Sequence, residues 1–423
     1  MRLEVSAVAG FQGTFRPPSD KSLTHRAYML GAIASGESVV RKPLTGEDCE
    51  ATLACVASMG LRYEREADLV RLRPAAEWTH PSGPLDCGNS GTTMRLLAGL
   101  VASRPLDVTM VGDASLSRRP MGRIATPLRL MGARVEGDTP PLRIVGGSLK
   151  GIEYQSPVAS GQIKSCCLLA GLRADGPTTV FEPSLSRDHT ERMLRAMGVS
   201  LTSFEGGVTV QPTDNLQAFD FTVPGDISSS AFLAVAAAIL PEGQLTITDL
   251  SVNPSRTGLL DVLTQTEVPY EITGARDELG EPVADVEIRA PKLLRAFKIA
   301  GDLVPRLVDE IPVLAVLATQ CEGTTTIRDA RELRVKESDR IAKMVDGLSR
   351  MGANIRAEED GMTIIGPTPL TGTTIDAAGD HRIAMAFAVA GLVAKGTTQI
   401  DGAESIATSF PDFERELWRL ALV

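Results

Sequence analysis

The sequence has little histidine, few aromatic residues and no patterned cysteine, and each shortage excludes a class of protein. Only four of its 423 residues are histidine, with no HExxH-like pair, which argues against a zinc site. The six cysteines show neither metal-ligand spacing nor a disulfide framework, so we expect small core residues in a reducing compartment. Aromatic residues make up 4% of the chain and its formal net charge is −10, which argues against a nucleic acid partner.

Long apolar runs and nucleotide-binding loops are missing as well. No run reaches the ~20 apolar residues that span a bilayer, so no membrane association is expected. The N-terminus MRLEVSAVAG lacks the basic and apolar regions of a secretory signal. There is no GxxxxGK loop and no Ser/His/Asp or Cys/His set, so nucleotide hydrolysis and covalent catalysis are poorly supported. With 43% hydrophobic residues, the composition indicates a cytoplasmic enzyme long enough to bury two cores.

What the sequence does contain is a hidden repeat. Four helical runs end in Met-Gly, at Met59-Gly60, Met131-Gly132, Met197-Gly198 and Met351-Gly352, and a short hairpin follows each. Glycine after the last helical turn adopts a left-handed conformation at little cost. With the Ala/Leu-rich helices and Gly-led strands between these points, the pattern predicts a unit of strand, helix, hairpin and helix, used six times. The fourth copy lacks Met-Gly and carries a long acidic hairpin around Asp277–Asp285.

Six copies could form a solenoid or two globular groups of three. Solenoid repeats usually advance by about 20–50 residues, whereas units of about 70 residues suit compact domains better. The segment before the first copy is a strand pair without helices, so it must complete a sheet of the C-terminal group. We therefore expect one domain at 16–225 and a second at 1–15 plus 226–423, with substrate-driven closure about the two crossings.

Basic residues gather where the repeat places helix starts, although the whole chain is acidic. A helix N-terminus offers unpaired N–H groups and partial positive charge, and added Arg or Lys makes an anion site. Any single one of these cations could be a solvated surface residue, but together they predict an anion-binding cleft. Ser90, Thr92, Ser160 and Ser228 could each be an N-cap, and for Ser228–Ser230 this is the preferred interpretation. The cations are Lys21, Arg26, Arg118, Arg119, Arg123, Arg187, Arg334, Lys336, Arg340, Lys343 and Arg382.

Two carboxylates stand among these cations. Asp309 opens the helix DEIPVLAVLA, and Glu337 follows Lys336 in RVKESDR. Asp309 could be an N-cap and Glu337 an ion-pair partner of Arg340. Cations would also keep either carboxylate ionised, so that it could act as a base towards a substrate hydroxyl.

Ten segments together resemble the 3-phosphoshikimate 1-carboxyvinyltransferase (EPSP synthase) family of enolpyruvyl transferases. The resemblance runs from about residue 10 to the C-terminus, and it implies an α/β fold: a two-domain inside-out α/β barrel of six βαβαββ repeats, three per domain. The segments are PSDKSLTHRAYMLGAIASGES, LDCGNSGTTMRLLAGL, LSRRPMGR, SGQIKS, SLSRDHTERMLRAMG, VPGDISSSAFLAVAA, NPSRTG, LVDEIPVLAV, ELRVKESDRIA and GDHRIAMAFAVAGL.

The resemblance also implies site residues and a reaction. The family moves the enolpyruvyl group of phosphoenolpyruvate to the 5-hydroxyl of shikimate 3-phosphate, without metal or organic cofactor, and we expect a monomer with these two small-molecule substrates. Asp309, Glu337 and Lys21 resemble its catalytic residues. Positions resembling the shikimate 3-phosphate contacts are Lys21, Ser22, Arg26, Ser160, Gln162, Arg187, Asp309 and Lys336. Those resembling the phosphoenolpyruvate contacts are Lys21, Gly91, Arg119, Gln162, Arg340 and Arg382.

Some positions depart from the family pattern. His25 stands where Asn is common, Gly161 where Ser or Ala is usual, and Thr408 where many relatives have Lys. A rival family, UDP-N-acetylglucosamine 1-carboxyvinyltransferase, carries a reactive Cys in the loop that reads ASLSRRPMG here. A binding-only descendant would be expected to lose Asp309, Glu337 or Arg382, and a non-enzymatic repeat scaffold would not need cations at helix starts.

Overall fold

The computed structural model describes residues 1–422, which form two compact units. Unit 1 contains Met1–Pro18, Pro224–Arg276 and the residues from Pro282 onward, and unit 2 contains Ser19–Val223 and Asp277–Glu281. The expected domain limits, 16–225 and 1–15 with 226–423, stay a prediction. The compact units differ from those limits chiefly in assigning the five residues Asp277–Glu281 to unit 2.

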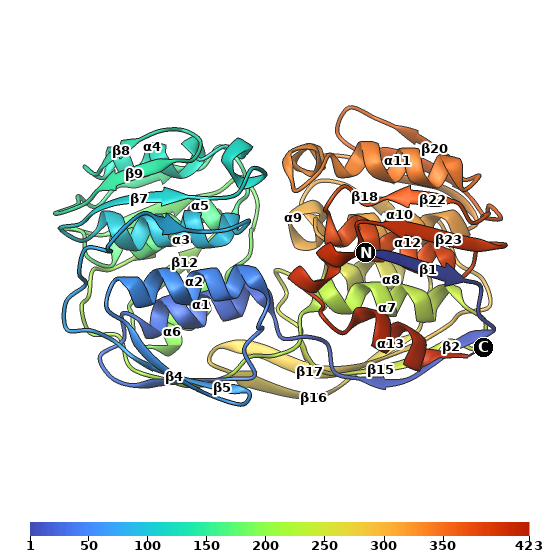
Figure 1. The fold of residues 1–423 in the computed structure, drawn as a ribbon, viewed down its shortest axis with the longest axis horizontal. Helices are drawn as coiled ribbons and strands as arrows, with labels where there is room; N and C mark the ends of the chain where they lie inside the picture. Colours follow the sequence, from blue (N-terminus) through green and yellow to red (C-terminus); the bar gives the residue numbers. More distant parts are fainter. Residues whose placement is uncertain (423) are drawn as a thin grey trace. The chain divides into compact units, whose positions relative to one another are not determined.

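Three helices fill the centre of unit 2. They are α1 (Lys21–Gly31), α3 (Gly91–Ala102) and α5 (Gly161–Gly171), and Figure 1 shows α3 and α5 side by side. Most of their residues are buried, including the polar Thr24, His25 and Arg26 of α1. The outer helices α2 (Glu47–Ser58), α4 (Gly122–Leu130) and α6 (His189–Ala196) bury one face each.

Three four-stranded sheets surround these helices, each with one parallel pair and two antiparallel pairs, one of which is a hairpin. In the first sheet, β14 from the end of the unit supplies the strand that the first repeat lacks. The sheets are β14 (Asp220–Thr222)–β3 (Ser38–Arg41)–β5 (Leu69–Arg73)–β4 (Arg62–Glu66), β6 (Leu85–Asp86)–β7 (Asp107–Val111)–β9 (Leu142–Val145)–β8 (Arg134–Glu136), and β10 (Glu153–Gln155)–β11 (Thr178–Phe181)–β13 (Gly207–Val210)–β12 (Leu201–Phe204).

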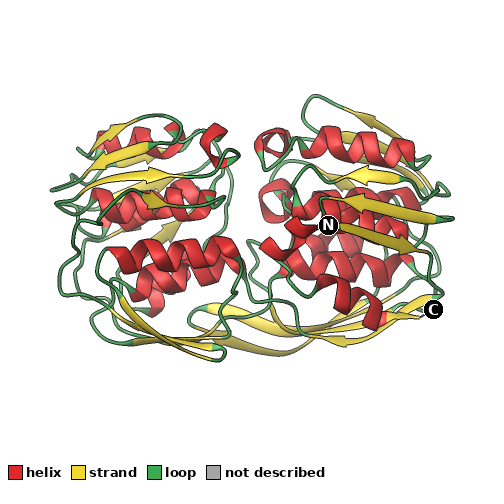
Figure 2. Cartoon of the chain, in the orientation of Figure 1, coloured by secondary structure: helices red, strands yellow, loops and turns green. Residues whose placement is uncertain are grey.

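Unit 1 repeats this plan around its own core. Its central helices are α7 (Ile227–Ile239), α10 (Ile311–Gln320) and α12 (His381–Gly391), which are buried almost throughout. Figure 2 shows strands at the margins of each unit, around the helices. The remaining helices are α8 (Gly258–Gln265), α9 (Leu303–Leu307), α11 (Arg340–Arg350) and α13 (Phe413–Leu420), with 3-10 turns at Leu116–Arg118 in unit 2 and at Arg331–Val335 and Ala403–Thr408 in unit 1.

The N-terminal strands complete two sheets of unit 1. Strand β1 (Arg2–Ser6) pairs antiparallel with β23 (Thr397–Asp401), and β2 (Gly10–Phe15) pairs parallel with β15 (Gln244–Ser251). The sheet orders are β1–β23–β22 (Thr374–Asp376), β16 (Tyr270–Glu278)–β17 (Glu281–Arg289)–β15–β2–β24 (Ala421–Leu422), and β18 (Lys298–Ile299)–β19 (Gly323–Ile327)–β21 (Met362–Gly366)–β20 (Asn354–Ala357).

The Met-Gly signal marks helix ends as predicted. Gly60, Gly132, Gly198 and Gly352 all have positive φ, between +89° and +116°, just after the last turn of α2, α4, α6 and α11. In the fourth copy, Glu267 takes this conformation with φ of 60° after α8. A side chain there costs roughly 1–2 kcal/mol more than glycine. The predicted α/β class with repeated βαβ units is confirmed.

Candidate active site

The central helices of unit 2 each begin with a capped N-terminus. Asp20 accepts a hydrogen bond from Leu23 N at 2.8 Å, Ser90 from Thr93 N at 3.0 Å, and Ser160 from Ile163 N at 3.4 Å. Ser90 and Ser160 are therefore N-caps, as one interpretation of the sequence held. The caps leave further N–H groups of each first turn directed along the helix axis, where they favour an anion.

Side chains at the starts of α3 and α5 bind one another. Gln162 Nε2 donates to Thr92 Oγ1 at 2.9 Å, and Arg95 donates to Gln162 Oε1 at 2.7 Å and to Pro120 O at 3.3 Å. Thr92 is therefore no cap but a partner of the predicted ligand residue Gln162. Sequence reasoning missed Arg95, although its position one helical turn after Gly91 was a usable signal.

Gly91 makes room for two guanidinium groups. A Cβ atom added at Gly91 would lie 3.0 Å from Arg95 Nη1 and 3.6 Å from Arg119 Nη1. Arg119 is held by Asn89, with Nη2 donating to Oδ1 at 2.5 Å and Nη1 donating to the backbone oxygen at 3.2 Å. The structure thus brings the predicted residues Gly91, Arg119 and Gln162 together.

The start of α1 carries the next group of cations. The Lys21 ammonium forms an ion pair with the Asp48 carboxylate, and Ser22 accepts a hydrogen bond from Arg26 Nη1 through its backbone oxygen at 2.9 Å. Arg26 is buried and also donates to Thr190 Oγ1 at 2.7 Å and to Ser165 Oγ at 3.0 Å. Three of its five N–H groups are thereby engaged, and its charge is fixed in one orientation.

Gly161 explains how Arg187 approaches the start of α5. A Cβ atom at Gly161 would lie 3.0 Å from Arg187 O and 3.1 Å from Arg187 Cβ, which is tighter than ordinary contact. The absent side chain therefore lets the half-buried Arg187 lie against the helix start. Lys164 nearby is 2% exposed and forms ion pairs with Glu182 and Glu191, each at 2.8 Å. These two carboxylates balance its charge within unit 2.

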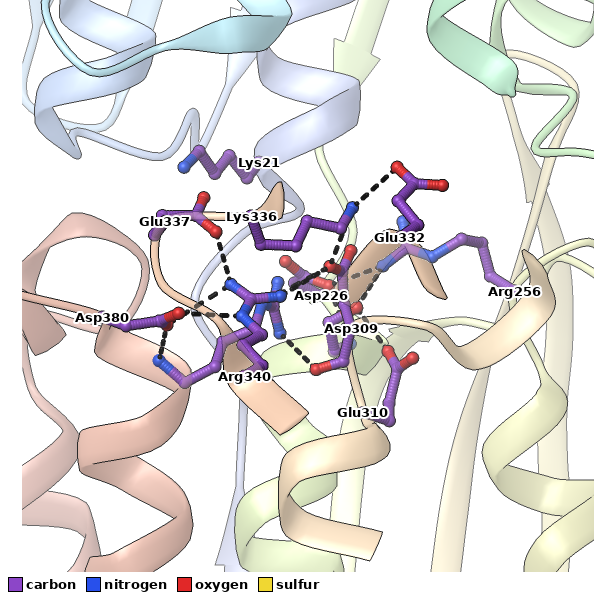
Figure 3. A network of polar contacts seen from close by, with 12 residues as sticks. Lys21, Asp226, Arg256, Asp309, Glu310, Glu332, Lys336, Glu337, Arg340 and Asp380 are labelled. Atoms are coloured by element: carbon purple, nitrogen blue, oxygen red, sulfur yellow. Dashed lines mark hydrogen bonds and ion pairs between the residues drawn. The ribbon is translucent and has the colours of Figure 1, made fainter. Parts of the chain in front are cut away.

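In unit 1 the corresponding feature is the network around Arg340 (Figure 3). This side chain is 1% exposed, and its Nε and Nη2 donate to Asp380 at 2.9 and 3.3 Å. Nη2 also donates to Glu337 at 2.6 Å, and Nη1 donates to Asp309 at 3.3 Å. Burial lowers the pKa of Arg340, but the Asp380, Glu337 and Asp309 carboxylates outweigh burial and raise it above its usual value.

Three cations surround the Asp309 carboxylate. Its Oδ1 lies 3.3 Å from Arg340 Nη1, 3.8 Å from Arg382 Nε and 3.9 Å from Lys336 Nζ. The Asp309 backbone oxygen also accepts from Arg382 Nη1 at 3.3 Å. The N-cap residue of α10 is Glu310, so the capping interpretation of Asp309 was wrong. The ion pair expected between Glu337 and Arg340 is present.

A buried polar group beside this network corrects the interpretation of Ser228. The N-cap of α7 is Asp226, which accepts from Ser228 N at 2.8 Å. The Ser228 hydroxyl instead donates to the Glu310 carboxylate and accepts from Arg256 Nη2 at 2.6 Å. Arg256 and Glu310 are both almost fully buried, and Asp226 accepts from the same Arg256 nitrogen at 3.1 Å.

Other sequence expectations concern cysteines, metals and membranes. All six cysteines are buried and free, as predicted for small core residues. Across residues 1–422, no group of three or more His, Cys, Asp or Glu side chains is placed to hold a metal ion. Of the helices within this range, none has the length and apolar character needed to cross a membrane.

These observations define a class of protein: a two-unit α/β repeat protein with clustered cations at the starts of its central helices. The sequence model of the family described as EPSP synthase (3-phosphoshikimate 1-carboxyvinyltransferase) matches residues 5–417. The chain is 48% identical over 425 residues to the 3-phosphoshikimate 1-carboxyvinyltransferase of Brevibacillus brevis, covering 99% of this chain and all of that protein. It is 49% identical to the enzyme of the same name from Geobacter sp. strain M21, covering 97% and 96% of the two chains.

Solved structures agree with this match. The structure of EPSP synthase from Acinetobacter baumannii superposes with a TM-score of 0.89 at 42% identity, covering 100% of this chain and 98% of that one. The chain therefore belongs to the EPSP synthase family. The two-domain inside-out barrel expected from the sequence is consistent with that family.

Proposed function

We propose that this protein transfers the enolpyruvyl group of phosphoenolpyruvate to the 5-hydroxyl of shikimate 3-phosphate. The products are 5-enolpyruvylshikimate 3-phosphate and inorganic phosphate, and the reaction serves aromatic amino-acid biosynthesis. The observation that carries the proposal is the Asp309 carboxylate among three cations, in a chain that matches the family along almost its whole length. A base next to a polyanionic substrate needs such surroundings to remain ionised.

We assign eight residues to shikimate 3-phosphate, as the family resemblance predicts. In unit 2, Arg26 offers two N–H groups beyond its internal hydrogen bonds, and the start of α5 adds backbone N–H groups near Arg187. In unit 1, Asp309 and Lys336 suit the sugar-like hydroxyls, since one accepts and the other donates. The assigned residues are Lys21, Ser22, Arg26, Ser160, Gln162, Arg187, Asp309 and Lys336.

Phosphoenolpyruvate carries both a carboxylate and a phosphate, which calls for several guanidinium groups. The Gly91 backbone can approach the ligand closely because it has no side chain, and Arg119 and Arg95 lie directly beside it. The residues assigned to this substrate are Lys21, Gly91, Arg119, Gln162, Arg340 and Arg382.

The chemistry is an addition followed by an elimination. First, the methylene carbon of phosphoenolpyruvate gains a proton, the 5-hydroxyl oxygen bonds to the neighbouring carbon, and Asp309 takes the hydroxyl proton. The new methyl group then loses a proton while the bond between carbon and phosphate oxygen breaks, which restores the double bond and releases phosphate. Glu337 and Lys21 give and remove the proton at the methyl carbon, and the surrounding cations stabilise the charge that develops.

We further propose that the protein works as a monomer in the cytoplasm, with its two small-molecule substrates as partners and without a cofactor. The reaction supports the lack of a cofactor, because proton transfer and anion binding are within the reach of the side chains named above. Light scattering of the purified protein tests the monomer directly.

The deciding experiment measures phosphate release from phosphoenolpyruvate with either shikimate 3-phosphate or UDP-N-acetylglucosamine as acceptor. Release with the shikimate compound alone is expected. Release with the nucleotide sugar alone would assign the protein to the rival activity. No release with either acceptor, from folded protein, would indicate a binding-only descendant and overturn the proposal.

A further inference from the structure

A buried pair joins the start of α6 to the beginning of β17. His189 opens α6 and Glu281 opens β17, both are 0% exposed, and His189 Nδ1 lies 2.8 Å from Glu281 Oε1. This contact holds the imidazole of His189 in one orientation against the Glu281 carboxyl group. Burying a carboxyl group costs free energy unless a partner compensates, and His189 is such a partner for Glu281.

The hairpin tip that carries Glu281 is attached to α6 at a second point. Arg192 of α6 donates from Nη1 to Gly280 O at 3.2 Å and from Nε to Asp188 at 2.8 Å. Gly280 has φ of +82°, and a Cβ atom there would lie 2.9 Å from Arg192 O. The tip of the hairpin therefore packs closely against α6. Because of these contacts with α6, Asp277–Glu281 belongs to unit 2, whereas the rest of the hairpin belongs to unit 1.

The start of α6 in turn holds a predicted phosphate ligand. Thr190, next to His189, accepts the hydrogen bond from Arg26 Nε at 2.7 Å, and its hydroxyl also lies 2.7 Å from Ser165 Oγ. Burial lowers the pKa of Arg26 to about 10, while the charges of Glu191, Asp20 and Glu281 oppose that effect. Arg187 lies only two residues before His189 in the chain. Any shift of the first turn of α6 would thus move both arginines assigned to the phosphate.

We propose that Glu281 is a positioning residue for the phosphate of shikimate 3-phosphate, acting through His189 on the first turn of α6. This inference rests on the proposed function, because it takes Arg26 and Arg187 as phosphate ligands. Glu281 itself touches neither substrate. Its role is to keep Thr190 and Arg26 in the orientation that binds a phosphate dianion.

The test compares Glu281→Gln with wild type in calorimetric binding of shikimate 3-phosphate and of shikimate, which lacks the phosphate. Glutamine keeps the size of the side chain but loses its charge. We expect affinity for shikimate 3-phosphate to fall about tenfold, with affinity for shikimate and the KM for phosphoenolpyruvate changed less than twofold. The matched control is Glu271→Ala, which removes an exposed carboxylate from β16 of the same hairpin and should change neither affinity.

Other outcomes separate the two proposals. Arg26→Gln is measured first: unchanged affinity for shikimate 3-phosphate would overturn the assignment of the phosphate site itself. If Arg26→Gln weakens binding but Glu281→Gln only lowers the melting temperature, or weakens both ligands equally, Glu281 is merely structural and this inference is wrong. Should Glu281→Gln not fold, His189→Gln tests the same contact from the other side and must show the same loss of phosphate discrimination.

Discussion

Arg340 and Asp380 form a charge pair in which both side chains are almost completely removed from solvent, with Nε donating to Oδ2 at 2.9 Å. Asp380 also accepts from Ser338 Oγ and from the backbone N–H of Arg382. The Asp380 carboxylate therefore binds the side chain of Arg340 and caps α12, the helix that carries Arg382. Both arginines are proposed to bind phosphoenolpyruvate. The pair therefore contributes both to the stability of unit 1 and to the positions of the side chains in its candidate site.

Replacing Asp380 should destabilise the protein strongly. Asp380→Asn keeps an acceptor for the helix cap but leaves the buried Arg340 without its main counter-charge, which costs about 3–5 kcal/mol. The free energy of unfolding in urea measures the effect. The control is Asp376→Asn, whose carboxylate pairs with Lys343 near the surface and should matter by less than ~1 kcal/mol. Equal losses in the two variants would contradict this account.

The same pair predicts how stability depends on pH. Burial would raise the pKa of Asp380, but the Arg340 guanidinium holds it below its usual value. The unfolded carboxylate, with a pKa near ~3.9, therefore binds a proton before the folded one does as the pH falls. The stabilisation is fully present above about pH 4–5 and is lost on further acidification through the folded value. Unfolding curves from pH 7 to pH 3 should converge for wild type and Asp380→Asn; a constant difference would refute the assignment.

Asp309 should matter for turnover rather than for stability. Asp309→Asn removes the proposed base while keeping a side chain of similar size among Arg340, Arg382 and Lys336. We expect kcat to fall about 10²–10⁴-fold, as is usual for loss of a general base. Steady-state rates and melting curves test this. Asp302→Asn, at an exposed position before α9, is the control. Wild-type turnover in Asp309→Asn would exclude it as the base.

Lys21 is predicted to act on the transferred group. Lys21→Met keeps the aliphatic part of the side chain but removes the ammonium that pairs with Asp48. Turnover should fall about 10²–10⁴-fold with only a small change in melting temperature. Lys150→Met, an exposed change in the same unit, serves as the control. A parallel loss of turnover and melting temperature would indicate a structural role instead.

A variant of Arg95 tests the role of the residue that sequence reasoning missed. Arg95→Met removes the hydrogen bond to Gln162 Oε1 and leaves the amide beside Gly91 with the bond from its Nε2 to Thr92 Oγ1. A charged hydrogen bond contributes about 1.5–3 kcal/mol, so KM for phosphoenolpyruvate should rise roughly 10–100-fold. KM for shikimate 3-phosphate should change much less. Arg62→Met on the exposed strand β4 provides the comparison, and equal changes in the two variants would contradict the proposal.

Local signals allowed much of the fold to be predicted. Gly60, Gly132, Gly198 and Gly352 stand where a left-handed residue ends a helix, and short-range backbone sterics decide that position. A helix was expected at DEIPVLAVLA, and the structure places α10 at Ile311–Gln320, where it is buried almost throughout. Capping was less predictable: Ser90 and Ser160 are caps, whereas Asp226 caps α7 in place of Ser228, and Glu310, not Asp309, occupies the N-cap position of α10, without a side-chain capping hydrogen bond. Neighbouring polar residues compete for the same N–H groups, and tertiary partners decide which one wins.

Long-range pairs could not be predicted in this way. His189 and Glu281 lie 92 residues apart, and nothing in the period of the repeat joins a helix start to the tip of an inserted hairpin. Ser228 and Glu310 likewise meet because α7 and α10 pack together, and Arg256 reaches the same Ser228 hydroxyl from the loop before α8. The sequence indicated which helix starts carry cations, but only the folded chain shows which carboxylates hold them.

The pairing of β1 with β23 also has a consequence for synthesis on the ribosome. The two strands are separated by almost 400 residues of chain, which translation at about 5–20 residues per second needs roughly 20–80 s to produce. During that interval the segment Ser19–Val223, which supplies nearly all of unit 2, has already emerged, while β1 and β2 still await their partners. Until their partners emerge, these strands have unpaired edges, which are prone to aggregation in a nascent chain.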